Sequence, residues 1–114
     1  MLLAETRGVE REAEILRALA HPVRLVILEA LSRDEECVCH LSALLKRPQP
    51  YVSKQLAELR EAGLVVDRRD AQRIYYRLTD ARIAALIEIT RAISGRPASL
   101  ARQTVPGCVC PRCS

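Results

Sequence analysis

The absence of large aromatic side chains is the strongest constraint on how this chain folds. Its 114 residues include no Phe, no Trp and only three Tyr. The core must therefore be built from Leu, Ile, Val and Ala, which suits small packed helices. Apolar residues form 49% of the chain and charged residues 28%, a balance typical of a chain that folds rather than stays disordered. This length supports one modest core, so we expect a single folded domain.

Apolar residues recur at helical spacing over the first half of the chain. They predict helices over residues 10–20, 22–32, 38–45 and 49–62. Pro22 suits the first turn of the second helix, and Gly63 suits the C-terminal cap of the fourth. A proline-rich break over residues 46–50 separates the third helix from the fourth. Two helices joined by a short turn, the second with polar groups outward, form a helix-turn-helix.

The fourth helix has one apolar face and one polar face. Val52, Leu56 and Leu59 are spaced as a buried stripe, so Ser53 and Lys54 are expected to face outward. After this helix the period of the pattern changes. Two β-prone segments flank a polar stretch, which predicts a β-hairpin from residues 64–66 and 73–78 with a basic tip.

A fifth helix is predicted from residue 79 or 80 to about residue 94, with Gly95 as its cap. It is apolar over a broad arc, so we expect it to pack against a second copy of the chain. The expected fold is therefore mainly α with a small β-hairpin (α+β), in a homodimer. Residues 1–94 form the folded domain, and residues 95–114 form a flexible tail that contains cysteines.

The net charge of +4 is unevenly distributed along the chain. Residues 1–45 hold five basic and eight acidic groups, and residues 46–78 hold eight basic and four acidic ones. Residues 79–114 hold five basic and two acidic groups. A basic middle behind an acidic front is the electrostatic pattern of a nucleic-acid-binding protein. A solvated surface with no binding role accounts equally well for charge alone.

The sequence disfavours membrane proteins and enzymes. The longest uninterrupted apolar stretch, residues 83–87, is too short to span a membrane. The N-terminus lacks a basic segment followed by a long apolar one, so we expect no signal peptide and a cytoplasmic location. We find no set of nucleophile, base and orienting group and no phosphate-binding glycine loop, so we expect no catalytic activity.

Five cysteines point to a chemical role; they are Cys37, Cys39, Cys108, Cys110 and Cys113. An odd number in a cytoplasmic chain argues against a disulfide framework and for metal or redox chemistry. Thiolates select soft ions over magnesium, calcium or manganese. On a regular helix Cys37 and Cys39 would project about 200° apart, so they cannot hold one ion there. Either Cys37 precedes the helix, or binding unwinds the first turn.

The order of the predicted elements resembles the winged helix-turn-helix of the ArsR/SmtB family of metal-responsive repressors. The resemblance is carried by ALAHPVRLVILEAL (18–31), ECVCHLSALL (36–45), QPYVSKQLAELREAGLV (49–65) and RRDAQRIYYRLTD (68–80). These strings occur in the family's order and cover most of the chain. The resemblance implies a homodimer that binds operator DNA and is released when a metal or metalloid binds.

The same resemblance implies that the helix over residues 49–62 enters the major groove and that the hairpin meets phosphates or the minor groove. It places near DNA the residues Gln49, Tyr51, Ser53, Lys54, Gln55, Arg68, Arg69 and Arg73. Gln reads adenine through paired hydrogen bonds, whereas Lys and Ser contact phosphates or base edges. Packing against the turn accounts nearly as well for Tyr51. Gln55 stands where family members often have His, so their base preference is not carried over.

The pair Cys37 and Cys39 resembles the cysteine pair of arsenic-, cadmium- and lead-sensing members at the start of the third helix. Ser42 stands where the arsenic-sensing type has a further cysteine, so we hypothesise that the tail supplies the missing thiolate. The metal ligands are then drawn from Cys37, Cys39, Cys108, Cys110 and Cys113, with As(III) or Sb(III) as the inducer. The tail belongs either to the same subunit or to the dimer partner.

The cysteines also suit three alternative chemistries. The same thiolates accept Cd(II), Pb(II) or Zn(II), or they are oxidised or persulfidated in a redox sensor. Cys110 and Cys113 are also spaced as in a small thiol oxidoreductase, but the βαβ context of that motif is missing. His40 is expected on the helix surface, and His21 at a helix junction, rather than in a metal site.

Overall fold

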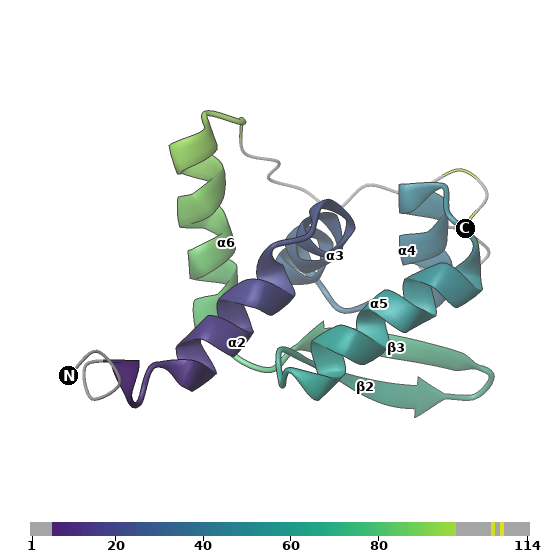
Figure 1. Cartoon of the computed structure of the whole chain (residues 1–114). Helices are drawn as coiled ribbons and strands as arrows, with labels where there is room; N and C mark the ends of the chain where they lie inside the picture. Colours follow the sequence, from purple (N-terminus) through teal and green to yellow (C-terminus); the bar gives the residue numbers. More distant parts are fainter. Residues whose placement is uncertain (1–5, 98–105, 107, 109–114) are drawn as a thin grey trace.

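The computed structural model describes residues 6–97, 106 and 108. Its elements, shown in Figure 1, are α2 (Glu10–Leu19), α3 (Pro22–Arg33), β1 (Glu36–Cys37), α4 (Val38–Leu45), α5 (Gln49–Glu61), β2 (Val65–Asp70), β3 (Arg73–Leu78) and α6 (Ala81–Ser94). The strands form one antiparallel sheet in the order β1-β3-β2. The five predicted helices are confirmed to within two residues at each end. The fold is a winged helix-turn-helix, in which α4 and α5 are the helix pair and β2–β3 (residues 65–78) are the wing.

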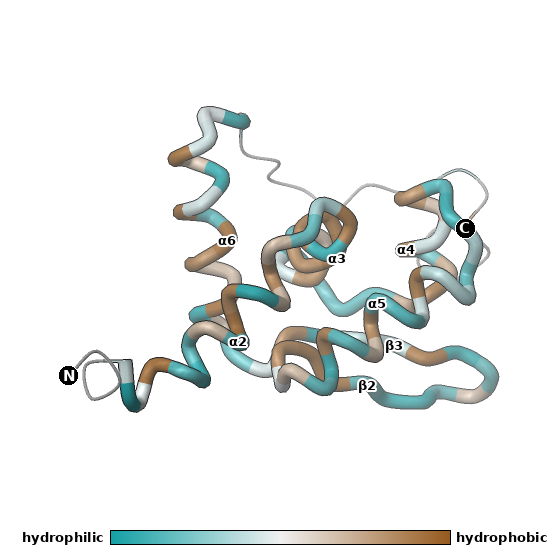
Figure 2. Tube along the Cα trace, in the orientation of Figure 1, coloured by the Kyte–Doolittle hydropathy of each residue, from teal (hydrophilic) through white to brown (hydrophobic). Residues whose placement is uncertain are grey.

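The core is aliphatic, as the lack of Phe and Trp predicts. Its most deeply buried side chains lie on α3, α4, α5 and β2 and are Ile27, Leu28, Leu41, Val52, Leu56, Leu59 and Val65. The stripe predicted on α5 is confirmed, because its three members are fully buried. In Figure 2 hydrophobic residues are concentrated where the helices meet, whereas the far end of the wing is hydrophilic. The core therefore fixes α5 against α3 and α4, and it leaves the wing tip in solvent.

Prolines and left-handed residues mark the ends of the helices. Pro22 lies in the first turn of α3 and Pro50 in that of α5, where a missing N–H leaves no bond unmade. Gly95 caps α6 with a φ of 81°. Lys46 caps α4 in the same left-handed region, with a φ of 53°. The tight turn between the helix pair thus depends on a strained non-glycine residue.

The sheet is larger than predicted. The strand β1 is missing from the prediction because two residues are too few to show an alternating pattern. Its partners are on β3, where Glu36 pairs with Tyr76 and Cys37 with Tyr75. The strand β2 runs on to Asp70 because pairing with β3 continues where its own side chains are polar and exposed. The wing therefore shares a three-stranded sheet with the residue that precedes α4.

Large apolar side chains remain exposed on α2 and α6. Leu16 is 56% exposed, Ile89 57% and Ile93 81%. In Figure 1 α6 stands at the opposite end of the molecule from the wing tip. Nothing in the described part of the chain forms a helix long and apolar enough to cross a membrane. The predicted tail over residues 95–114 lies mostly outside the described residues.

Candidate functional site

The two cysteines of the pair sit on either side of the start of α4. Cys37 has an extended backbone (φ −82°, ψ 159°) and is the N-cap residue, and Cys39 lies in the first helical turn. Cys37 therefore precedes the helix, which confirms the first of the two geometries expected for this pair. The backbone N–H of His40 donates to Cys37 Sγ at 3.3 Å. This placement brings both sulfur atoms to the same side of the helix start.

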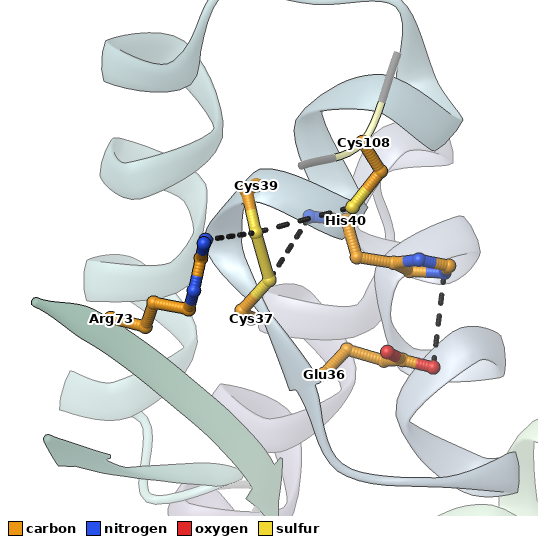
Figure 3. Close-up of a disulfide and its surroundings, with 6 residues drawn as sticks. All are labelled: Glu36, Cys37, Cys39, His40, Arg73 and Cys108. Carbon is orange, nitrogen blue, oxygen red and sulfur yellow. Dashed lines mark hydrogen bonds and ion pairs between the residues drawn. A yellow bond between two sulfur atoms is a disulfide. The ribbon is translucent and has the colours of Figure 1, made fainter. Parts of the chain in front are cut away.

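Three sulfur atoms meet at this point, as Figure 3 shows. Cys37 and Cys39 are joined by a disulfide, with their Cα atoms 5.3 Å apart. Cys108, from the tail, has its Sγ 4.0 Å from Cys39 Sγ. The three Sγ atoms lie within 4.8 Å of one another. The odd number of cysteines argues against a disulfide framework, but this pair does form a disulfide, because the extended Cys37 turns its side chain back toward Cys39.

The structure thus brings together three of the five cysteines predicted as ligands. The tail cysteine that reaches the pair, Cys108, belongs to the same chain. Cys110 and Cys113 lie outside the described residues, so their part in the site stays a prediction. As a disulfide, Cys37 and Cys39 cannot bind a metal, since ligation needs the thiolate. Once reduced, they offer with Cys108 a compact set of three soft ligands.

The surroundings of the pair are partly buried and polar. Cys37 is 2% exposed and packs with Tyr75, while Cys39 and Cys108 are half-buried beside them. The Nη1 of Arg73 donates to Cys39 Sγ at 3.7 Å. A guanidinium next to a sulfur atom stabilises the thiolate form once the disulfide is reduced. The sequence gives no sign of this contact, because Arg73 and Cys39 come from different elements.

The predicted surface position of His40 is wrong. Its side chain is buried, at 3% exposure, and its Nε2 lies 3.8 Å from Oε2 of Glu36, which is also buried. Glu36 lies on β1 and His40 in the first turns of α4, so the pair joins the strand to the helix that follows it. The pairing provides a polar partner for a histidine inside the protein. Figure 3 shows this pair facing away from the sulfur atoms.

Most of the residues predicted to meet DNA on α5 are exposed. Gln49, Ser53 and Lys54 are open to solvent, and Tyr51 is half-buried with the Arg47 guanidinium 5.5 Å from its ring centroid. Gln55 differs from the others. It is 7% exposed, and its Oε1 accepts from Nε of Arg24 on α3 at 2.8 Å.

The exposed face of α5 is therefore narrower than predicted, because Gln55 is turned toward α3. The contact of Gln55 with DNA stays a prediction, as do the contacts predicted for the other residues of α5. The hydrogen bond between the Gln55 and Arg24 side chains holds α5 against α3, in addition to the apolar contacts of the core.

The three wing arginines have different surroundings. Arg69 is exposed. Arg68 donates from Nε and Nη2 to the two carboxylate oxygens of Glu35, at 2.9 and 2.6 Å, and lies 4.7 Å from the ring centroid of Tyr75. The hydrogen bond with Glu35 raises the pKa of Arg68 above its ordinary value. Arg73 is half-buried and faces the cysteines.

Comparison with known proteins identifies the family. A profile described as "Bacterial regulatory protein, arsR family" matches residues 21–66. The Biofilm growth-associated repressor of Agrobacterium fabrum is 46% identical over 93 residues, which is 82% of this chain and 79% of the relative. The chain belongs to the ArsR/SmtB family. It is a transcriptional repressor of this type, as the sequence pattern predicts.

Further relatives and solved structures agree with this assignment. The Arsenic resistance transcriptional regulator ArsR1 of Pseudomonas putida is 43% identical over 65 residues, 56% of this chain and 51% of the relative. HlyU from Vibrio cholerae superposes with a TM-score of 0.73 at 33% identity, covering 79% of this chain and 98% of that one. The winged helix-turn-helix DNA-binding domain Mb0332 of Mycobacterium bovis, described as homodimeric, gives a TM-score of 0.72 at 27% identity, over 80% and 84% of the two chains.

Proposed function

We propose that this ArsR/SmtB repressor binds operator DNA as a homodimer and is released when Cys37, Cys39 and Cys108 bind As(III) or Sb(III). The observation that carries the proposal is the meeting of three Sγ atoms within 4.8 Å. Sulfur atoms bound to one ion at about 2.3 Å, the zinc–sulfur distance, lie roughly 4 Å apart, so the bonded sulfur atoms of Cys37 and Cys39 must separate after reduction, whereas Cys108 already lies at such a distance from Cys39. Three thiolates also balance the charge of a trivalent ion.

The binding step is an exchange of ligands on arsenic. Reduction of the Cys37–Cys39 disulfide by a dithiol gives two thiols and a new disulfide on the reductant. Arsenite, As(OH)₃, then exchanges its three hydroxyl groups for the thiols of Cys37, Cys39 and Cys108 and releases three water molecules. No oxidation of arsenic is involved. The proposal therefore requires a reducing environment but no further reactant.

The DNA side of the proposal rests on exposed polar groups of α5 and the wing. Gln49, Ser53 and Lys54 are open to solvent at the start of α5, the end of the helix that enters the major groove in helix-turn-helix proteins. Arg69 is exposed on the wing. These groups suit one half-site of a pseudo-palindromic operator. Because Lys and Arg contacts to phosphate release counterions, the affinity is expected to fall steeply with salt, and an affinity independent of salt would contradict this docking.

The homodimer rests on the apolar side chains left exposed at the other end of the molecule. Leu16 of α2 and the two isoleucines of α6, Ile89 and Ile93, are more than half exposed. A monomer seldom leaves such a surface in water, and a second copy covers it by two-fold symmetry. The homodimeric state described for Mb0332, which has the same fold, supports this arrangement.

The test is fluorescence anisotropy of a labelled duplex selected from random sequences with the reduced protein. Arsenite, antimonite, Cd(II), Pb(II) and Zn(II) are titrated separately into the complex. Arsenite and antimonite are expected to release the DNA at the lowest concentrations. If Cd(II) or Pb(II) released the DNA at far lower concentrations, that ion, and not As(III) or Sb(III), would be the inducer.

The third ligand is tested by a matched pair of variants. Cys108→Ser is expected to raise the arsenite concentration for half-release at least tenfold, because only two of the three clustered thiolates remain. The double variant Cys110→Ser, Cys113→Ser is the comparison: it removes two other tail thiols, and it is expected to leave the concentration for half-release unchanged if Cys108 is the third ligand. Unchanged release in Cys108→Ser would contradict the proposed ligand set.

A second candidate function is thiol redox sensing, favoured by the disulfide between Cys37 and Cys39. In this reaction the two thiols lose two electrons and two protons to an oxidant such as diamide, which becomes the hydrazine. Release of DNA by diamide, with no effect of arsenite on the reduced protein, would favour redox sensing over metalloid sensing.

A further inference from the structure

The segment that carries Cys37 belongs to the same sheet as the wing. Cys37 pairs with Tyr75 and Glu36 with Tyr76, across β1 and β3. The strand β3 is paired in turn with β2 from one end of the wing to the other. A displacement of Cys37 therefore reaches the backbone of the wing through a single row of strand pairing.

Two side-chain bridges reinforce this connection. Arg73, the first residue of β3, donates from Nη1 to Cys39 Sγ at 3.7 Å. Arg68 of β2 is bonded to both carboxylate oxygens of Glu35, two residues before Cys37, and its guanidinium lies over the ring of Tyr75. Figure 3 shows the Arg73 side chain reaching from the wing toward the sulfur atoms. The wing is thus attached both to Cys39 and to Glu35, which precedes the cysteine pair.

The connection from the cysteines to α5 is more open. A cavity of about 310 Å³ lies between them, lined on one side by Cys37 and Cys39 and on the other by Gln49 and Ser53 of α5. Arg73 lines the same cavity from the wing. A change at the sulfur atoms therefore meets the wing through direct bonds, whereas it reaches α5 through the packing of α4 against that helix.

We propose that the wing is a direct output of the cysteine site and that Arg73 is the positioning residue that couples the two. This inference rests on the proposed function, since it requires a signal at the thiols. In the ligand-free protein Arg73 holds β3 against Cys39 Sγ. When As(III) binds this sulfur through one electron pair, the thiolate loses its negative charge and holds the Arg73 guanidinium less tightly, so the wing leaves the position in which it meets DNA.

The first test is hydrogen–deuterium exchange on the reduced full-length chain, with and without arsenite and without DNA. In the wild type, arsenite is expected to speed amide exchange in residues 65–78. Arg73→Gln is expected to show the faster exchange already without arsenite, and to change little when it is added. If Arg73→Gln only destabilised the fold, amide exchange would instead become faster throughout the chain.

The second test compares operator binding with and without arsenite. Arg73→Gln is expected to reduce the ratio of the two dissociation constants about fivefold. Arg69→Gln is the matched control, because it removes an exposed wing charge that does not face the cysteines. It is expected to weaken both states alike and to leave the ratio unchanged. If Arg73→Gln fails to fold by circular dichroism, Arg73→Lys, which keeps the charge but not the guanidinium, takes its place.

Two outcomes separate this inference from the proposed function, with arsenite binding measured by native mass spectrometry. If arsenite binds and releases DNA while exchange changes in residues 49–61 and not in the wing, the coupling is overturned and the proposed function stands. If arsenite does not bind, the proposed function fails. The coupling between the cysteines and the wing is then tested by comparing amide exchange in the reduced and the diamide-oxidised protein, since Arg73 contacts the same sulfur atom in this case. Equal exchange of the wing amides in both forms would overturn the coupling.

Discussion

The two hydrophobic clusters of this molecule are built differently. The larger one joins α2, α3, α4, α5, α6 and two strands through aliphatic side chains and includes Leu56 and Tyr76. The smaller one consists of Cys37 and Tyr75, with Cys39 and Cys108 packed against them. The larger cluster fixes α5, the helix proposed to read DNA, whereas the smaller one joins the cysteines to the wing. Because the cysteine cluster lies at the margin of the core, the sensing proposed for it would not require the domain to unfold.

The largest expected effect tests whether the clusters differ in stability. Leu56→Ala is expected to lower the free energy of unfolding by about 3 kcal/mol, because it empties a fully buried site that is closely packed. Cys39→Ala, in the smaller cluster, is expected to lower it by less than about 1 kcal/mol. Urea unfolding under reducing conditions at fixed protein concentration measures both. Equal losses would show that the clusters do not differ in this way.

A sharper comparison uses two neighbouring tyrosines of β3, which are equally buried but belong to different clusters. Tyr76→Ala is expected to lower the free energy of unfolding by about 3 kcal/mol, since it opens the main core. Tyr75→Ala is expected to lower it by about half as much, because its neighbours are few and partly exposed.

The two tyrosine variants also separate an effect on folding stability from an effect on the response to arsenite. Tyr75→Ala is expected to change the arsenite dependence of operator binding, because Tyr75 pairs with Cys37 and lies under Arg68. The same measurement is made on Tyr76→Ala below the unfolding temperature of that variant. If Tyr76→Ala changed the arsenite dependence as much, the two faces of β3 would not differ in this respect.

A smaller change in the free energy of unfolding is expected at two tight turns, one in the helix-turn-helix and one at the wing tip. Lys46, in the helix-turn-helix, and Ala71, at the wing tip, both have a positive φ. Lys46→Gly and Ala71→Gly are each expected to raise the free energy of unfolding by about 0.5 kcal/mol, since relief of left-handed strain slightly exceeds the entropy lost by glycine. Thermal unfolding measures both changes. A loss of stability in either variant would show that the position is not strained.

The smallest expected effect depends on pH and concerns Asp80, the N-cap of α6. The side-chain hydrogen bond from Arg82, followed by its backbone N–H, lowers the pKa of Asp80 to about 2. Because the folded value lies below the ordinary 3.8, Asp80 stabilises the fold above about pH 4, and this contribution is lost as the pH falls toward 2.

Asp80→Asn keeps the cap but removes the charge. Its melting temperature is expected to be lower than that of the wild type by about 2 °C at pH 7 and to converge with it near pH 2. Melting curves at several pH values between 2 and 7 test this. A constant difference over the whole range would assign the effect to the cap geometry alone.

The sequence predicts the elements of this fold well and the contacts between them poorly. Helices such as α5 are readable because their apolar residues repeat along a single segment. The strand β1, the burial of His40 and the turn of Gln55 toward Arg24 depend instead on partners from other segments or on pairings with no periodic signal. The same holds for Arg73, whose contact with Cys39 spans 34 residues. Cysteine spacing does predict that Cys37 and Cys39 lie together at the start of α4, because both belong to one short segment; that they bind an ion stays a prediction.

One detail of the site bears on how sensitive such a repressor is. Cys37 Sγ accepts the backbone N–H of His40 and so serves as the cap of α4. An ion that occupies this sulfur competes with the helix for it. A cap is worth about 1 kcal/mol, which corresponds to roughly a fivefold change in dissociation constant. Under the proposed function, the concentration at which the repressor responds would be set partly by the end of a helix, and evolution could adjust it without the gain or loss of a thiol.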